Sequence, residues 1–565
     1  MSFRQLVGAL TVIVGGMLWS CAPPQPGYAP GYRGGMVTSA DSLATQAGLD
    51  ILKKGGNAFD AAVTVGFVLA VTHPQAGNIG GGGFALIYVV DSSKVYALDF
   101  RETAPHRASR DMYLDNDGEA IDQLSTKGFL ASGTPGTVAG LLEILNCFGS
   151  LPRTEIMQPA IDLAESGFIV DSALAARFAN YAESFAQFAS TRKYFLQDGQ
   201  PFTGGDTLIQ ADLARVLKLI AEKGKAGFYS GETAGRLATE MSKHGGLIDE
   251  FNLASYQAVW REPIQFDYSR LTIYSISPPS SGGVIMGEIF GILANFEISG
   301  RQPTDPWYIH LLTESCRLAY ADRSVYLGDP DFAYNPTELL LSQDYLYTRS
   351  RQIDTTQALP SIRVGAGLEV KESESTTHYC VIDSAGNIVS LTYTINSNFG
   401  CKQVVNGLGF FMNNEMDDFS IKPGMPNQFG LIGGEANAIA PGKRMLSSMS
   451  PTIVFYNDRP TMIVGTPGGS KIITSVTATI LNFFGFGMSL DSAINLPHYH
   501  HQWLPDKLYY EKGAFDTTQI RVLTDMGHNL QQRSDYGDLQ VIVIQPDGSY
   551  VGASDRRGNG YAAGY

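Results

Sequence analysis

The chain has 565 residues, of which 44% are hydrophobic and 17% charged, a composition typical of a globular protein with ample core. This length fits three or four domains or one large core. The formal net charge of −15 argues against a nucleic-acid partner, because phosphate binding requires a basic surface.

The first 21 residues have the pattern of an export signal. A positively charged residue precedes an apolar run, Leu6 to Leu18, that is too short to span a bilayer. Leu18-Trp19-Ser20-Cys21 then resembles the lipobox of bacterial lipoproteins, in which the cysteine is lipidated. Trp19 is bulkier than that pattern usually carries, and ordinary signal-peptidase cleavage near Ala22 is the alternative. We therefore expect an exported, periplasmic protein, with Cys21 as the candidate lipid anchor.

Residues 22–36 are rich in Pro, Gly and Tyr and are predicted to form a flexible tether. Helical spacing follows over 41–53 and 58–71, and 84–90 is predicted to be a buried strand. The glycines of 77–83 do not fit a dinucleotide fingerprint, because a strand and not a helix follows them. We expect them to allow tight backbone packing.

Residues 136–325 contain several predicted helices, including 211–223 and 306–326. Beyond the signal, no apolar run is long enough for a membrane span. The later cysteines have no zinc-like spacing, and their disulfide pairing is not readable from the sequence. We expect them to be buried as small hydrophobic residues; they are Cys147, Cys316, Cys380 and Cys401.

A threonine begins a strand-like pattern immediately after a polar run, at Ser375-Thr376. Cutting the chain before Thr376 would free its α-amine, which has a pKa of roughly 7.7–8.0 and can act as the base for the threonine hydroxyl. Two strands, 376–383 and 388–395, flank a turn at 384–387. Pairing them places Thr376 opposite Ile395 to within one register step, with Thr394 positioned to orient the amine and Asn396 to face a substrate.

Pro467-Gly468-Gly469-Ser470 directly precedes a predicted helix over 471–483, and another helix is predicted over 489–495. Glycines at a helix start expose backbone N–H groups, which suits an oxyanion hole at Gly468 and Gly469. The spacing to Lys471 does not match a P-loop, and a helix start with no catalytic role is the alternative.

Histidines raise two further hypotheses. His498-Tyr499-His500-His501 clusters three of them, but no acidic or cysteine ligand follows at a recognised spacing, so no metal is predicted. His378 lies two residues after Thr376, on the same strand face. A supporting position is expected for it, since a freed amine would lie nearer to the hydroxyl.

Four motifs follow one another in order: Thr376-Thr377-His378-Tyr379, Asn413-Asn414-Glu415-Met416-Asp417-Asp418, Leu446-Ser447-Ser448-Met449-Ser450-Pro451 and Pro467-Gly468-Gly469-Ser470. With them the chain resembles the γ-glutamyltransferase family of N-terminal nucleophile hydrolases, from about Gly34 to Tyr565. The resemblance implies an α+β fold, a four-layer αββα sandwich. It also implies one precursor that processes itself into a large subunit (37–375) and a small catalytic subunit (376–565), associated as a heterodimer.

The resemblance also assigns roles to residues. Arg101, Ser447 and Ser448 match the family's carboxylate-binding positions, and Asn396, Glu415 and Asp418 match those that accept the substrate ammonium. Gly468 and Gly469 match the oxyanion glycines. Residues 423–437 correspond to a lid, with Phe429 where tyrosine is common. Ser375 departs from the residues that are frequent before the cut.

The implied activity is that of a γ-glutamyltransferase and glutathione hydrolase without metal or organic cofactor. Thr376 would attack γ-glutamyl amides such as glutathione, and water or an amino-acid or dipeptide amine would resolve the γ-glutamyl-enzyme. One rival is an acylase for glutaryl-type side chains, which lack the α-amine that Asn396, Glu415 and Asp418 would bind. The other rival is an unprocessed, non-enzymatic surface lipoprotein.

Overall fold

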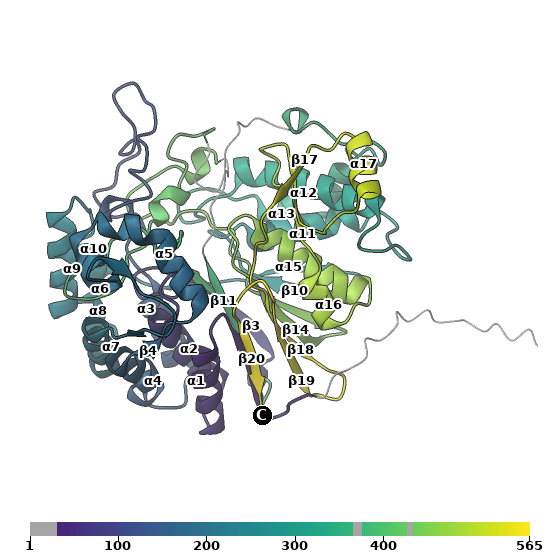
Figure 1. The fold of residues 1–565 in the computed structure, drawn as a ribbon. Helices are drawn as coiled ribbons and strands as arrows, with labels where there is room; N and C mark the ends of the chain where they lie inside the picture. Colours follow the sequence, from purple (N-terminus) through teal and green to yellow (C-terminus); the bar gives the residue numbers. More distant parts are fainter. Residues whose placement is uncertain (1–30, 365–375, 426–432) are drawn as a thin grey trace, which may run out of the picture.

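The computed structural model describes residues 31–364, 376–425 and 433–565. Over these residues the protein combines many helices with two large antiparallel sheets (Figure 1). The predicted export signal and three predicted functional residues, Cys21, Ser375 and Phe429, lie outside the described residues. Among the described helices, none combines the length and the apolar character needed to cross a membrane.

The first sheet has seven strands in the order β20-β1-β11-β12-β2-β3-β8, and the second has six in the order β19-β18-β14-β13-β10-β9. The strands of the first sheet are β1 (Gly35–Ser39), β2 (Gly82–Val89), β3 (Lys94–Asp99), β8 (Val259–Arg261), β11 (Thr377–Asp383), β12 (Ile388–Thr394) and β20 (Tyr561–Gly564). Those of the second are β9 (Ile264–Tyr268), β10 (Leu271–Ser275), β13 (Thr452–Tyr456), β14 (Arg459–Gly465), β18 (Gln540–Ile544) and β19 (Tyr550–Ser554). Each sheet therefore takes strands from both sides of the predicted cleavage point.

Shorter strands lie outside the two sheets: β4 (Phe168–Ile169), β5 (Leu196–Gln197), β6 (Gln200–Pro201), β7 (Thr207–Leu208), β15 (Tyr499–His500), β16 (Leu508–Glu511) and β17 (Leu530–Arg533). They form small separate sheets at the periphery.

The central strands β11 and β12 of the first sheet are buried along their whole length. Successive side chains of a strand point to opposite sides, so both faces of these strands lie in a core. In β11, Tyr379 and Val381 belong to a core that includes residues of the early helices. Cys380 and Ile382 belong to a second core, which contains side chains of the second sheet. Burial on both faces explains the continuous apolar character of this strand.

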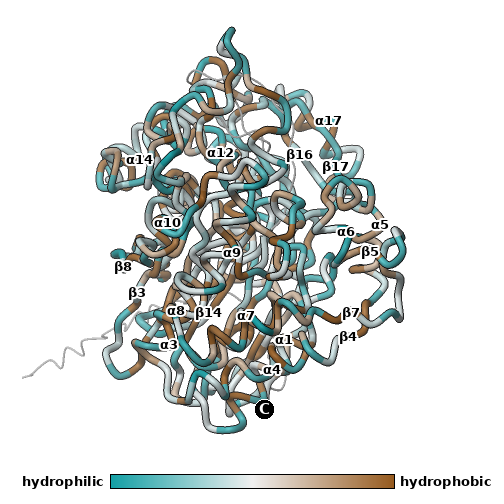
Figure 2. Tube along the Cα trace, turned by 90° about the vertical axis from the view of Figure 1, so that its left-hand side faces the viewer, coloured by the Kyte–Doolittle hydropathy of each residue, from teal (hydrophilic) through white to brown (hydrophobic). Residues whose placement is uncertain are grey.

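Helices flank the pair of sheets, with α1 to α10 on one side and the labelled helices from α11 onward on the other (Figure 1). The first group is α1 (Ser42–Lys53), α2 (Ala58–Thr72), α3 (Thr137–Phe148), α4 (Arg153–Ser166), α5 (Ser172–Ala186), α6 (Ala189–Phe195), α7 (Ala211–Lys223), α8 (Ala226–Tyr229), α9 (Gly231–Lys243) and α10 (Glu250–Ser255). The second is α11 (Gly282–Leu293), α12 (Pro306–Tyr326), α13 (Thr337–Leu340), α14 (Gln343–Ser350), α15 (Lys471–Ile480), α16 (Leu490–Asn495) and α17 (Thr517–Asp525). In Figure 2 the hydrophobic stretches run through the middle of the molecule and hydrophilic residues dominate its outer loops.

The predicted helices and strands are confirmed to within a few residues, and those over 211–223 and 306–326 have the predicted bounds. The flexible tether was predicted to extend to residue 36, but main-chain hydrogen bonding begins before that residue. β1 begins at Gly35, and the N–H groups of Arg33 and Gly34 donate to the carbonyl of Tyr565. The expectation of buried cysteines is right for three of them and wrong for Cys147, which is exposed near the end of α3.

Candidate functional site

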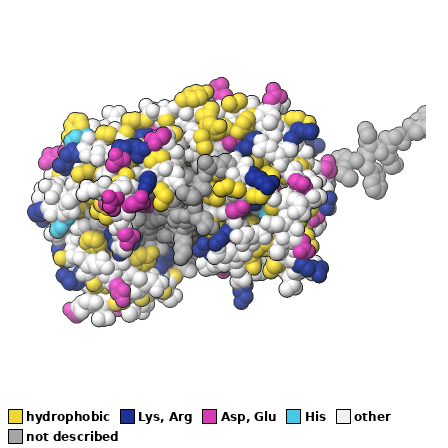
Figure 3. Space-filling model, turned by 90° about the horizontal axis from the view of Figure 1, so that it is seen from above, with side chains coloured by type: hydrophobic (Ala, Val, Ile, Leu, Met, Phe, Trp, Pro, Cys, Tyr) yellow, Lys and Arg dark blue, Asp and Glu magenta, His cyan; other side chains and the backbone are white. Residues whose placement is uncertain are grey.

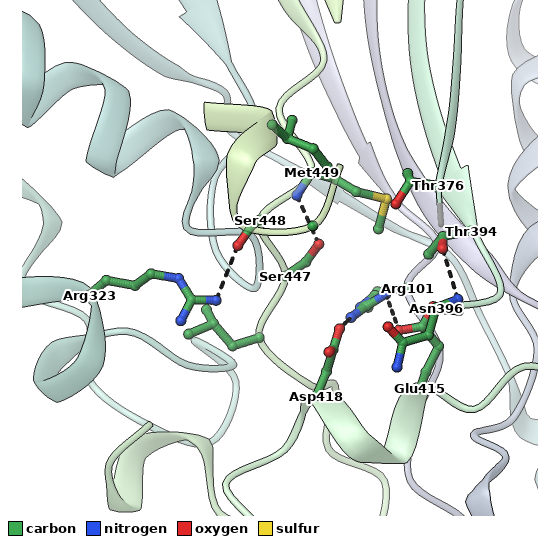
Figure 4. Close-up of a pocket in the computed structure, with 13 residues that line it drawn as sticks. Arg101, Arg323, Thr376, Thr394, Asn396, Glu415, Asp418, Ser447, Ser448 and Met449 are labelled. Atoms are coloured by element: carbon green, nitrogen blue, oxygen red, sulfur yellow. Dashed lines mark hydrogen bonds and ion pairs between the residues drawn. The ribbon is translucent and has the colours of Figure 1, made fainter. Parts of the chain in front are cut away.

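A small pocket opens where the start of β11 and the end of β12, two central strands of the first sheet, meet the loops before α15 and after β12. Its wall brings most of the predicted site residues together (Figure 4). The lining residues are Arg101, Arg323, Thr376, Thr394, Asn396, Glu415, Asp418, Leu446, Ser447, Ser448, Met449, Gly469 and Ile472. The cavity has a volume of about 30 Å³.

Thr376 stands just before β11, and its neighbour Thr377 pairs with Tyr393 of β12. Continuing this register sets Thr376 beside Thr394, one step from the predicted partner Ile395. Thr394 is 3% exposed, and its Oγ1 accepts a hydrogen bond of 2.8 Å from the N–H of Asn396. The hairpin therefore places two hydroxyl groups at one strand end, facing the pocket.

The glycine-rich loop before β2 packs directly behind this strand end. A Cβ on Gly81 would come 2.0 Å from the carbonyl oxygen of Thr394, and one on Gly80 would come 2.2 Å from that of Phe411. The predicted tight packing of the loop is thus confirmed. Its glycines allow the backbone to support Thr394 closely.

Asn396 has a φ of 73°, a left-handed conformation that asparagine tolerates better than most residues. Its Nδ2 donates to the carbonyl of Asn414 at 2.9 Å, which ties the end of β12 to the motif that holds Glu415 and Asp418.

Arg101 follows β3, is 1% exposed and is held by carboxylates of the protein. Its Nη1 lies 2.7 Å from Glu415 Oε2, and its Nη2 lies 2.5 Å from Asp418 Oδ2. Burial opposes the charge on Arg101, but Glu415, Glu102 and Asp418 raise its pKa overall. Arg101 thus pairs with two residues that were predicted to bind the substrate ammonium, so the predicted carboxylate and ammonium sites are one connected cluster.

Ser447 and Ser448 approach the pocket from the opposite wall. The carbonyl of Ser447 accepts hydrogen bonds of 2.8 Å from both the N–H and the hydroxyl of Ser281, at the start of α11. Ser447 Oγ accepts from the N–H of Met449 at 3.0 Å. The loop is therefore held from behind, with both hydroxyl groups on the pocket wall.

Gly468 and Gly469 precede α15 with φ values of 137° and 57°, a region that favours glycine. Their carbonyls accept from the N–H groups of Lys471 and Ile472 at 3.1 and 3.2 Å. Their own N–H groups make no hydrogen bond to another described residue. Gly469 lines the pocket, next to Gly468 in the chain.

The histidines take structural positions. His378 is fully buried, with its ring nitrogens 2.8 Å from Thr392 Oγ1 and 3.2 Å from Cys380 Sγ. Burial lowers its pKa to about 3, so it is neutral at physiological pH. In the predicted cluster, His500 contacts Thr474 Oγ1 at 2.9 Å and His501 contacts Asp506 at 3.3 Å.

A different set of potential metal ligands, His310, Glu314 and His528, comes together within the described residues. The two histidines hydrogen-bond to each other at 2.8 Å. Glu314 accepts from the Arg317 side chain and from a backbone N–H. These contacts account for the cluster as a hydrogen-bonded network.

Arg323 is a pocket residue that sequence reasoning missed. It extends from α12, is 4% exposed and donates through Nη2 to Ser448 Oγ at 3.3 Å (Figure 4). The sequence around a single arginine in a long helix does not indicate that it lies in a pocket, because packing decides which face of the helix meets the pocket. Met449, Leu446 and Ile472 add the apolar part of the wall.

Residues 44–565 match the family model described as Gamma-glutamyltranspeptidase. The chain is 45% identical to the glutathione hydrolase proenzyme of Escherichia coli (strain K12), over 99% of this chain and 98% of that protein. A cephalosporin acylase from Bacillus halodurans has a similar structure, with a TM-score of 0.85, 27% identity and coverage of 97% and 99% of the two chains. The Helicobacter pylori gamma-glutamyltranspeptidase structure aligns with a TM-score of 0.56 and 39% identity, over 60% of this chain and 97% of that one. The chain belongs to the gamma-glutamyltranspeptidase family of glutathione hydrolases, enzymes of the N-terminal nucleophile type.

Proposed function

We propose that this protein is an exported γ-glutamyltransferase and glutathione hydrolase whose nucleophile is Thr376, freed by self-cleavage after Ser375. The observation that carries the proposal is the single pocket in which Thr376 meets Thr394, Asn396 and the Arg101 cluster. These groups come from separate segments of the chain, and each supplies a function that γ-glutamyl transfer requires.

The chemistry would proceed in two halves. The Thr376 hydroxyl oxygen attacks the γ-carbonyl carbon while the α-amine of the same residue takes the hydroxyl proton. The N–H groups of Gly468 and Gly469 stabilise the oxyanion. The amide C–N bond then breaks, and the amine passes its proton to the leaving nitrogen. Water or an amino-acid amine attacks the resulting ester, which releases glutamate or a new γ-glutamyl compound and restores the hydroxyl.

Self-cleavage would convert the single chain into a large and a small subunit within a four-layer αββα sandwich. Cleavage would free the Thr376 α-amine on the wall of the pocket, beside Thr394.

Several features favour a small zwitterionic donor. The carboxylates of Glu415 and Asp418 and the amide of Asn396 suit an ammonium group, and the hydroxyls of Ser447 and Ser448 suit a carboxylate. On the face seen in Figure 3, acidic and basic side chains are intermingled, without the basic patch that nucleic acid requires. No metal or organic cofactor enters these steps.

The likeness to a cephalosporin acylase makes a glutaryl-type acylase the second candidate function. Glutaryl amides lack the α-ammonium, so the Glu415 and Asp418 carboxylates would have no partner on such a substrate. Parallel turnover of γ-glutamyl-p-nitroanilide and glutaryl-p-nitroanilide separates the two functions. Preference for the glutaryl compound would favour the acylase.

Intact-mass measurement and N-terminal sequencing of the purified protein test the nucleophile. We expect two fragments, the smaller of which begins at Thr376, and a single uncut chain for Thr376→Ala. An uncut wild-type chain would contradict the enzymatic proposal and favour a non-enzymatic lipoprotein. The mass of the large fragment also tests export, because signal removal shortens it and a lipid on Cys21 adds mass.

A further inference from the structure

The two walls of the pocket differ in how their guanidinium groups are paired. Around Arg101, three carboxyl groups (Glu102, Glu415 and Asp418) lie within 3.6 Å of one guanidinium. On the opposite wall, Arg323 makes no ion pair with any carboxylate of the described residues. One arginine of the pocket is therefore surrounded by carboxyl groups, whereas the other contacts hydroxyl groups.

Burial of Arg323 without a carboxylate partner is costly, because an unpaired charge loses its hydration. Burial lowers its pKa to about 10, so the guanidinium remains charged at neutral pH. Asp418 attracts Arg323 without forming an ion pair with it, and an anion bound beside the serines would supply a further countercharge. Arg323 lies on the same wall as the Ser447-Ser448 loop, to which it donates.

Arg323 supports both serines of that loop. Its Nη2 donates to Ser448 Oγ at 3.3 Å, and its Nε donates to Ser281 Oγ at 2.9 Å. The Ser281 hydroxyl in turn donates to the Ser447 carbonyl at 2.8 Å. The guanidinium therefore bridges the start of α11 and the serine loop.

This arrangement orients the serine protons. A hydroxyl has one donor and two acceptor sites. Ser448 Oγ accepts from Arg323, and Ser447 Oγ accepts from the Met449 N–H. Neither hydroxyl donates to another described residue, so both protons are available to an acceptor in the pocket. A carboxylate has the acceptors that fit this pair.

We propose that Arg323 is a positioning residue for the α-carboxylate of the γ-glutamyl donor. It holds Ser447 and Ser448 as hydrogen-bond donors and contributes positive charge behind them. The carboxylate would then lie at Arg101, Ser447 and Ser448, the positions that the family resemblance assigns to it, with Arg323 behind the two hydroxyl groups. This inference rests on the proposed function and adds a positioning residue to the same site.

The test compares γ-glutamyl-p-nitroanilide with its analogue in which the α-carboxylate is a carboxamide. The wild-type enzyme should prefer the acid. In Arg323→Met we expect KM for the acid to rise, so that the preference for the acid over the carboxamide falls at least about tenfold. This magnitude corresponds to the loss of one charge-assisted hydrogen bond. The carboxamide should be turned over nearly as before. Ser448→Ala should also reduce the preference for the acid over the carboxamide. The double variant, Arg323→Met with Ser448→Ala, should show little further loss of this preference.

Arg317→Met is the matched control, since Arg317 is buried on the same helix and pairs with Glu314 away from the pocket. It should affect both substrates equally. The fraction of chain cut before Thr376 checks folding in each variant. If Arg323→Met does not mature, Ser281→Ala removes the Nε contact with less disturbance and should also reduce the preference.

Equal losses for the acid and the carboxamide in Arg323→Met would overturn the inference, because a purely structural role affects both substrates alike. An unchanged preference in Arg323→Met, or in Ser281→Ala where that variant replaces it, would overturn it as well. A wild-type protein that is cut but turns over neither substrate would instead refute the proposed function, and this inference with it.

Discussion

Glu102 carries a fully buried carboxyl group beside Arg101, and neither of its oxygens has a hydrogen-bond partner among the described residues. Arg101 Nη1 lies 3.6 Å away but is engaged by Glu415. Burial raises the pKa of Glu102 from its ordinary value of 4.5 to about 8, against the opposing charge of Arg101. At neutral pH the folded protein therefore holds a proton here that the unfolded chain releases.

This difference makes stability depend on pH with a definite sign. A carboxyl group with a raised folded-state pKa stabilises the fold fully at low pH, and its contribution is lost as the pH rises toward that pKa. When the folded state binds one proton more than the unfolded state, the unfolding free energy changes by about 1.4 kcal/mol per pH unit. Between pH 5 and pH 8 the unfolding free energy should therefore fall by up to about 4 kcal/mol on account of this group.

We expect Glu102→Gln, which keeps the shape and removes the titration, to flatten this dependence. Urea unfolding of the mature protein, followed by tryptophan fluorescence at half-unit steps from pH 5 to 8.5, measures it. Glu119→Gln is the control, because Glu119 is an exposed partner of Lys422, with its side chain 64% exposed. Equal pH slopes for Glu102→Gln and wild type would refute the reasoning.

Two further substitutions test how the strand end is supported. Gly81→Ala would place a methyl group 2.0 Å from the carbonyl oxygen of Thr394, so we expect roughly a hundredfold loss of kcat on γ-glutamyl-p-nitroanilide. Gly235→Ala, in α9, should leave kcat unchanged, because its methyl group would meet Glu250 Oε1 at an ordinary contact distance of 3.5 Å. Lys402→Met removes a buried Nζ that donates to three loop oxygens at 2.6–2.9 Å just after β12. For Lys402→Met, the free energy of unfolding measured in urea should fall by about 1–3 kcal/mol. Lys54→Met, at an exposed lysine, should have almost no effect. Equal unfolding free energies for the two variants would contradict a stabilising role of Lys402.

Much of the fold was predictable because its signals are local. Helical spacing identified 306–326 with its observed bounds, and the turn at 384–387 identified the β11–β12 hairpin. The hairpin register was predictable only to within one step, because the exact pairing is set by neighbours such as β2, which belongs to a distant part of the chain. Exposure of Cys147 was missed, since the orientation of α3 depends on tertiary packing.

The family, the candidate nucleophile Thr376 and the set of polar groups around it can be read from the amino-acid sequence, because short motifs in a fixed order carry them. How the charges of these groups are shared depends on packing in three dimensions. Arg101 and Asp418 are 317 positions apart and form an ion pair, while Arg323 is buried without a carboxylate partner among the described residues. Ion pairing and burial depend on distances between remote segments, and no local pattern records those distances.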